Sequence, residues 1–362
     1  MGRNYKMELV EKIEKIQYVD DIDGLDVLIK PIPDGENEGE MDPRIYPGFR
    51  KMGWLSRFLP KRFFKMKADE KSIEKLREVF NKVDSTPIVE SQIAKDTFYI
   101  ESFDGYKLRM TVFGEGDAST PILYFIHGGG FFAGRTEVVE EALKLLVEKT
   151  DVIVYSLDYR LAPEYSYPTG HKDTFEGFKW IIREGMGNKD SIFVAGDSAG
   201  GNLTQYVVNQ ALNEGIQGVR GQVLLYPTLN MAEVADAYSE VDFSKFKPLR
   251  SQRHGISVAL SMLEGSGAML QELLGVDRTD HVDLSPYVSV NPKLPATLIS
   301  VGEFDALRSE GIAYGKKLKD EGVDVSVHFY RGLAHAYLDQ VGNLPQSEDC
   351  VIEIAKFIER NK

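Results

Sequence analysis

The residues best suited to chemistry lie in the segment Gly196-Asp197-Ser198-Ala199-Gly200. A buried strand predicted for residues 191–195 precedes it, and a helix predicted for 199–214 follows. This is the G-x-S-x-G elbow, in which a strained strand-to-helix turn exposes a serine oxygen above a sheet. Gly196 and Gly200 supply the small residues that so tight a turn requires. We predict that Ser198 is a nucleophile. A glycine-rich turn with a serine helix cap is the alternative.

A second glycine-rich segment is suited to hold the negative charge that attack by the serine creates. A strand predicted for residues 121–126 ends in His127-Gly128-Gly129-Gly130. Glycines let the main chain approach a substrate, and backbone N–H groups stabilise an oxyanion. Such a loop acts together with the amide that follows the nucleophile. We therefore predict that Gly128, Gly129 and Ala199 are the donors, with His127 and Gly130 supporting the loop. A phosphate loop is disfavoured because its lysine is missing.

The serine needs a base, and six histidines compete for that role. His335 follows the last predicted strand, 324–330, which places it at the same sheet edge as Ser198. The elbow belongs to a fold in which the chain order is serine, acid, histidine. Asp305 follows the strand predicted for 296–301 and fits this order. Glu303 is the first alternative, and Asp283, in the expected insertion, is a less favoured one. Asp305 would fix the tautomer of His335 and stabilise its charged form.

Alternating helical and strand-like stretches must position these residues. From about residue 120 onward they predict an α/β fold with a mostly parallel central sheet flanked by helices. Right-handed crossovers bring the carboxyl ends of the strands to one active edge. The gap of roughly 70 residues after Tyr226 is much longer than a strand-helix unit needs. We expect 228–285 to be an insertion that forms a cap with 1–90, over a catalytic domain of 91–227 and 286–362. Within 1–90, helices are predicted at 5–18 and 69–83, and 21–67 is expected to be irregular.

Composition narrows the classes of function and partner. The net charge of −13 disfavours nucleic acid as a partner. One cysteine, Cys350, cannot form an internal disulfide, which is typical of a reducing compartment. The N-terminus has no apolar signal region, and no apolar run is long enough to span a membrane. We expect a cytoplasmic protein without stable membrane insertion, and a homodimer is left open.

Residues 57–67 (RFLPKRFFKMK) mix basic and aromatic side chains. They fit either an interfacial membrane patch or a cap element that packs its aromatic rings over the pocket. The sequence favours the packed cap element.

Four motifs together carry a family resemblance: HGGGF at 127–131, DYRLAPE at 158–164, GDSAGGN at 196–202 and DALRSEG at 305–311. With His335, they resemble the hormone-sensitive-lipase-type branch of the α/β-hydrolases, the HGGG esterases and lipases. The resemblance spans about 120–340. It implies an acyl-enzyme mechanism with neither metal nor cofactor, and a helical cap. It also implies that Asp158, Arg160 and Glu164 are structural, and that Asp197 supports the nucleophile. Ala306 stands where the family often has proline, which should not affect the acid.

The expected function is hydrolysis of a small-molecule ester through an acyl-enzyme. Short acyl chains are favoured, with acetyl esters of alcohols or sugars among them. The alternative is a non-catalytic ligand-binding protein on a hydrolase scaffold, because plant hormone receptors of the same branch are similar in fold but lack the catalytic histidine. Ser198, Asp305 and His335 are all present here, which favours the enzyme.

Overall fold

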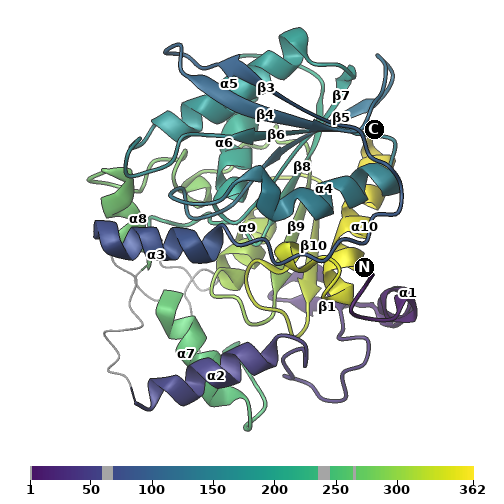
Figure 1. Ribbon diagram of the computed structural model, residues 1–362, viewed down its shortest axis with the longest axis vertical. Helices are drawn as coiled ribbons and strands as arrows, with labels where there is room; N and C mark the ends of the chain where they lie inside the picture. Colours follow the sequence, from purple (N-terminus) through teal and green to yellow (C-terminus); the bar gives the residue numbers. More distant parts are fainter. Residues whose placement is uncertain (1, 59–67, 235–244, 264–265) are drawn as a thin grey trace.

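A single sheet organises the computed structural model, which describes residues 2–58, 68–234, 245–263 and 266–362. Among these residues the sheet has ten strands in the order β1-β2-β10-β9-β8-β7-β5-β6-β4-β3 (Figure 1). Their bounds are β1 Tyr18–Ile22, β2 Leu25–Lys30, β3 Lys95–Glu101, β4 Lys107–Phe113, β5 Pro121–Ile126, β6 Ile153–Asp158, β7 Asn188–Asp197, β8 Val219–Leu225, β9 Ala296–Gly302 and β10 Val325–Tyr330.

The inner strands are parallel, as predicted. Every pairing from β2 through β10, β9, β8, β7 and β5 to β6 is parallel. The pairs β1–β2, β6–β4 and β4–β3 are antiparallel and lie toward the two edges. All six residues of β5 are buried, because a strand covered on both faces must be apolar throughout.

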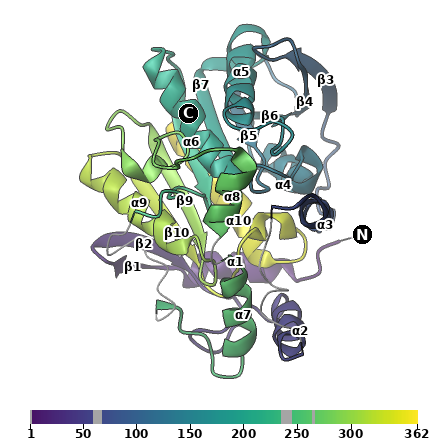
Figure 2. The ribbon, with the colours of Figure 1, turned by 90° about the vertical axis from the view of Figure 1, so that its left-hand side faces the viewer.

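Helices cover both faces of the sheet, as Figure 2 shows from the side. On one face α5, α6 and α9 bury the larger apolar cluster, and on the other α4 and α10 bury the second. Helix α1 packs against α10. The bounds are α1 Met7–Ile16, α4 Thr136–Lys149, α5 Thr169–Glu184, α6 Ala199–Asn213, α9 Arg308–Asp320 and α10 Pro345–Asn361.

The N-terminal region differs from the sequence prediction. Residues 18–30 were expected to fall mostly in an irregular part of a cap, but they form the hairpin β1–β2 and extend the central sheet beside β10. Asp23 and Gly24 make its turn, with φ of 55° and 83°. Asp-Gly is a strong hairpin signal. All five residues of β1 are exposed or half-buried, so the apolar alternation that marks a strand is weak there.

The remaining helices lie beyond the carboxyl ends of the parallel strands. They are α2 Tyr46–Ser56, α3 Glu70–Phe80, α7 Arg253–Leu263 and α8 Ser266–Leu274. Helices α2 and α7 lie side by side (Figures 1 and 2). Helix α2 falls in the stretch that was expected to be irregular. The sequence did not predict this helix because Pro47, Gly48 and Gly53 lower its helix propensity. Pro47 is tolerated in the first turn. At Gly53 a Cβ would lie 2.9 Å from the Cα of Gly255, so glycine permits the close contact with α7.

Candidate active site

Ser198 lies in a tight turn between the end of β7 and the start of α6. Its φ of 54° and ψ of −118° lie in a region that non-glycine residues rarely adopt. A Cβ on Gly196 would lie 2.7 Å from the carbonyl oxygen of Ile126, and one on Gly200 would lie 2.7 Å from that of His127. Only glycine fits at these two positions, so the local sequence accounts for the strained turn that presents the serine.

Three predicted side chains meet at the carboxyl edge of the sheet. The Nε2 atom of His335 lies 2.8 Å from Ser198 Oγ, and its Nδ1 atom lies 2.7 Å from Asp305 Oδ2. A carboxylate can only accept, so Nδ1 carries the proton and Nε2 is left to accept the serine hydroxyl. Asp305 is fully buried, and its other oxygen accepts the N–H of Leu307 at 2.9 Å. The arrangement is that of a nucleophile, a base and an orienting acid.

Nearby carboxylates set the protonation of His335. Burial lowers the pKa of His335, but the charge and hydrogen bond of Asp305 outweigh burial, so the pKa lies above its ordinary value. Asp197 and Glu310 act in the same direction. Burial raises the pKa of Asp197, and it raises that of Glu310 to about 8. The positive charge that His335 would gain from the serine proton is therefore stabilised in the site.

The glycine loop after β5 corrects one prediction. Gly128 was expected to donate to an oxyanion, but its N–H donates to the buried Oδ1 of Asp197 at 2.8 Å. An amide committed to a buried carboxylate is not available to a substrate. Among the described residues, the N–H groups of Gly129 and Gly130 have no acceptor in the protein. With Ala199 at the first position of α6, these two are the candidate donors. The sequence missed this because glycine spacing does not show where an amide points.

His127 braces this loop, as predicted. Its Nδ1 lies 2.8 Å from the carbonyl oxygen of Gly128, so Nδ1 is the donor. Its ring stacks on Tyr159 with centroids 4.5 Å apart, and the Tyr159 hydroxyl donates to the His127 carbonyl at 3.1 Å. These contacts fix the start of the glycine loop.

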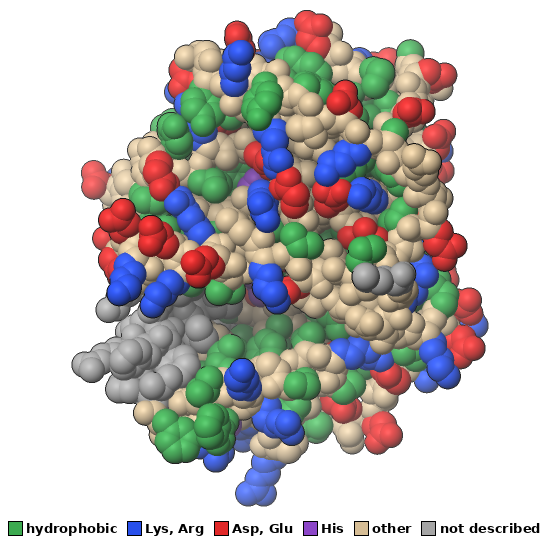
Figure 3. All heavy atoms as spheres, in the orientation of Figure 1, with side chains coloured by type: hydrophobic (Ala, Val, Ile, Leu, Met, Phe, Trp, Pro, Cys, Tyr) green, Lys and Arg blue, Asp and Glu red, His purple; other side chains and the backbone are tan. Residues whose placement is uncertain are grey.

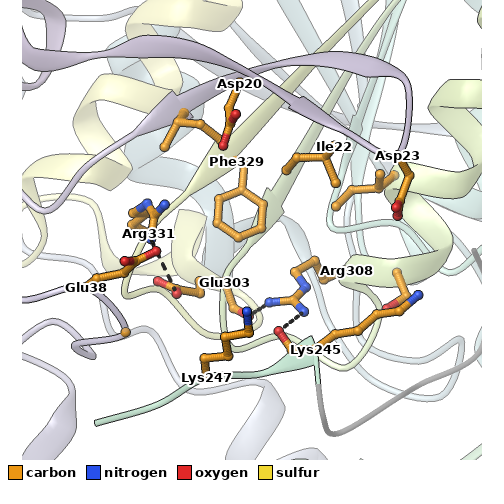
Figure 4. A pocket seen from close by; sticks show the side chains of 14 residues that line it. Asp20, Ile22, Asp23, Glu38, Lys245, Lys247, Glu303, Arg308, Phe329 and Arg331 are labelled. Atoms are coloured by element: carbon orange, nitrogen blue, oxygen red, sulfur yellow. Dashed lines mark hydrogen bonds and ion pairs between the residues drawn. The ribbon is translucent and has the colours of Figure 1, made fainter.

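The alternative acid, Glu303, faces away from the base. Its Oε2 accepts the N–H of Gly332 at 2.8 Å, and its side chain lines a separate cavity of about 540 Å³ near Arg308 and Arg331 (Figure 4). Glu303 therefore ties the loop after β9 to the loop that carries His335. Asp283 lies against Tyr167 and His281, so of the three candidate acids only Asp305 contacts the imidazole of His335.

A residue of α3 that the sequence did not single out also contacts the site's loops. Arg77 of α3 donates from Nε to the carbonyl oxygen of Phe132 at 2.7 Å and from Nη2 to that of Ala162 at 2.9 Å. The same guanidinium binds both oxygens of Glu164. The helical pattern over residues 69–83 shows only the apolar face of α3, and nothing in it distinguishes Arg77 from neighbouring charges.

Two further contacts join α3 to the glycine loop. The N–H of Gly134 donates to Asn81 Oδ1 at 2.8 Å, one residue past the end of α3. The rings of Phe80 and Phe132 pack with centroids 5.5 Å apart. Helix α3 therefore holds residues 132–134 from outside the hydrolase core.

The acidic and basic residues of 158–164 brace the loops around the site. Asp158 accepts the N–H of Thr136 at 2.9 Å at the start of α4. Arg160 binds the buried Asp173 and also Asp104. These contacts match the structural role that the resemblance implies. In the described part of the chain, no group of three or more His, Cys, Asp or Glu residues could hold a metal ion.

Comparison with known proteins places this site in a family. Residues 123–339 match a family model described as the alpha/beta hydrolase fold. Esterase LipI of Mycobacterium tuberculosis is 29% identical over 247 residues, which cover 64% of this chain and 70% of LipI. Carboxylesterase NlhH of the same organism is 30% identical over 227 residues, which cover 60% and 67%. An esterase structure from Pyrobaculum calidifontis superposes with a TM-score of 0.65 at 24% identity, covering 88% of this chain and 98% of that one.

The fold and the site define a hydrolase of the α/β-hydrolase class. The chain belongs to the α/β-hydrolase fold family, in the branch of the hormone-sensitive-lipase-like esterases, and it is a carboxylesterase-like hydrolase. The family and the fold predicted from the sequence are confirmed.

Proposed function

We propose that the protein is a serine carboxylesterase that cleaves short-chain acyl esters through an acyl-enzyme. The observation that carries the proposal is the continuous row of contacts from Asp305 through His335 to Ser198, at 2.7 and 2.8 Å. A histidine that accepts the hydrogen bond of a serine hydroxyl in a strained elbow activates that serine as a nucleophile.

In the first half of the reaction, Ser198 Oγ attacks the ester carbonyl while His335 Nε2 takes the hydroxyl proton. The amides of Gly129, Gly130 and Ala199 donate to the oxyanion. The C–O bond to the alcohol then breaks, and His335 returns its proton to the leaving oxygen. In the second half, His335 takes a proton from water, the resulting hydroxide attacks the acyl-enzyme, and Ser198 leaves with the proton.

Turnover of p-nitrophenyl acetate and butyrate tests the proposal. Ser198→Ala should lower kcat by about 10⁶-fold, because the whole arrangement acts as a unit. Ser257→Ala is a matched control, since this exposed serine on α7 lies outside the site. A folded wild-type protein without turnover on either ester, or a Ser198→Ala variant of wild-type activity, would refute the assignment.

The preference for short acyl chains is tested separately, with nitrophenyl esters of increasing acyl length and with acetylated alcohols and sugars. Helix α8 supports the preference because it covers the glycine loop: a Cβ on Gly130 would lie 3.5 Å from Leu270 Cδ2. We expect kcat/KM to fall as the acyl chain lengthens. A rise toward long chains would contradict this part of the proposal.

The rival function, ligand binding without catalysis, has less support. Ligand binding alone does not require the hydrogen bond between His335 Nε2 and the hydroxyl of Ser198 in its strained turn. No helix among the described residues is long and apolar enough to cross a membrane. A cytoplasmic location and a homodimer stay predictions from the sequence.

A further inference from the structure

The charge of this acidic chain is distributed unevenly. Residues 45–67 contain seven lysines and arginines, six aromatic residues and no acidic residue, whereas the whole chain has a net charge of −13. A basic and aromatic segment in an acidic protein points to an anionic partner with an apolar interior.

The described part of this segment presents these side chains to solvent. Helix α2 and the turn after it expose Trp54 and Phe58 by 57% and 69%, with ring centroids 5.1 Å apart. Arg50 and Lys51, one turn earlier on the same face, are exposed and form no ion pair among the described residues. We call these four residues the α2 patch. In Figure 3 the lower part of the molecule, around α2 and α7, shows mainly hydrophobic and basic side chains.

The α2 patch is not the inner face of a cap helix. The other side of α2 contacts α7 at Gly53 and Gly255, and Phe49 packs against the apolar cluster that contains Ile256. That packing uses the apolar side of the helix and leaves Trp54 and Phe58 outside it. The preference for a cap element at 57–67 that packs its aromatic rings is wrong for Phe58, whose ring is exposed, whereas an exposed Arg57 fits both interpretations. The rest of that range lies outside the described residues.

The patch is fixed in position relative to the active site. The cluster beneath α2 also contains Phe304 and Ala306, the neighbours of Asp305, and Ala334 packs against it beside His335. A surface bound by the α2 patch would therefore lie at the same end of the molecule as the carboxyl edge of the sheet.

We propose that the α2 patch docks the protein on the surface of an anionic lipid bilayer. Exposed tryptophan and phenylalanine rings enter the interface between headgroups and acyl chains, and lysine and arginine bind the anionic headgroups. An acidic protein partner would account for the basic residues but would leave the two exposed aromatic rings unexplained. Docking in this orientation brings the site toward esters that partition into the bilayer.

Sedimentation with vesicles tests the docking independently of any esterase activity. The wild-type chain should bind phosphatidylcholine vesicles that contain phosphatidylglycerol, and binding should fall at least tenfold on phosphatidylcholine alone or in high salt. Trp54→Ser with Phe58→Ser should abolish it, and Arg50→Glu with Lys51→Glu should weaken it at least tenfold. Tyr99→Ala with Lys107→Glu, at exposed positions on β3 and β4, is the matched control and should bind like the wild type.

Tryptophan fluorescence reports the same contact directly. The chain has two tryptophans, Trp54 and Trp180. Trp180 is not part of the α2 patch and packs against Phe98, so a change in emission on binding is expected to come from Trp54. Anionic vesicles should shift the emission to the blue in the wild type, and Trp54→Phe should remove that shift. Three results would each overturn the proposal. They are no binding to anionic vesicles, equal binding to vesicles without anionic lipid, and unchanged binding of the variant with Trp54→Ser and Phe58→Ser.

Discussion

At the scale of single residues, the account depends on where protons and hydrogen bonds lie around Ser198. The sequence predicted that Ser198, His335 and Asp305 would meet, because each follows a strand in the order that the fold dictates. It could not predict that Gly128 donates to Asp197, because that contact joins the loop after β5 to the end of β7, 69 residues away, through one side-chain oxygen. Motifs indicate which residues gather at an edge, whereas the direction of an amide depends on the folded backbone.

The pH dependence of activity follows from the raised pKa of His335. The base acts only when neutral, so kcat/KM should fall as the pH drops through this pKa, and the inflection should lie above about 6.5. Asp305→Asn removes the charge that raises the pKa, so it should move the inflection down and lower kcat by about 10⁴-fold. A pH profile on a soluble nitrophenyl ester measures both effects. An inflection at the same pH in the variant would contradict the assigned role of Asp305.

Asp197 should act mainly as an acceptor for Gly128, because its charge affects the pKa of His335 less than that of Asp305 does. Burial raises the pKa of Asp197, and an amide oxygen can accept the same N–H. We expect Asp197→Asn to keep kcat within about tenfold of the wild type, a change of about 1.4 kcal/mol. Asp197→Ala should leave a buried N–H unsatisfied and lower the free energy of unfolding by about 1–3 kcal/mol, with a larger loss of kcat. Thermal unfolding and steady-state kinetics separate the two variants, and equal behaviour would argue against this role.

At the scale of elements, helix α3 holds the main chain of the glycine loop. Arg77 and Asn81 bind the main chain at Phe132 and Gly134, close to the candidate oxyanion donors. The sequence predicted the helix from its apolar face but not its function, because that function depends on contacts to carbonyl groups of a distant loop. It missed α2 because glycine and proline lower helix propensity, and packing against α7 overrides that tendency.

Arg77→Met should therefore lower kcat by about 10–100-fold while KM changes little, because the oxyanion contacts strengthen in the transition state. Affinity for a trifluoromethyl ketone, which forms an oxyanion on the serine, should fall in parallel. Arg77→Lys should restore part of the loss. Lys75→Met on the same helix is the control, since Lys75 is exposed. A change in KM alone would assign Arg77 to substrate binding instead.

At the scale of the whole molecule, the N-terminal hairpin is part of the central sheet. Lys30 at the end of β2 is fully buried and binds Asp349 at 3.1 Å and Glu353 at 3.0 Å on α10. Tyr330 on β10 also donates to Asp349, at 2.7 Å. These contacts join the first strands to the last helix. The sequence left residues 21–67 irregular because pairing across some 300 residues leaves no local signal beyond the Asp23-Gly24 turn.

Lys30→Met should destabilise the whole fold. It leaves Asp349 as a buried carboxylate without its cation, while Glu353 keeps its ion pair with Lys356, and breaking a buried ion pair typically costs about 3–5 kcal/mol. Denaturant unfolding of the variant beside Lys12→Met, an exposed lysine on α1, measures the difference. Equal midpoints for the two variants would show that the hairpin is attached only loosely to the core.

The most direct measurement of the central claim is the site of covalent labelling by a fluorophosphonate, read by mass spectrometry of the digested protein. We expect one adduct, on the peptide that carries Ser198, formed rapidly in the wild type, slowly in His335→Ala and not at all in Ser198→Ala. An adduct on any other residue, or none on a folded wild-type protein, would contradict it.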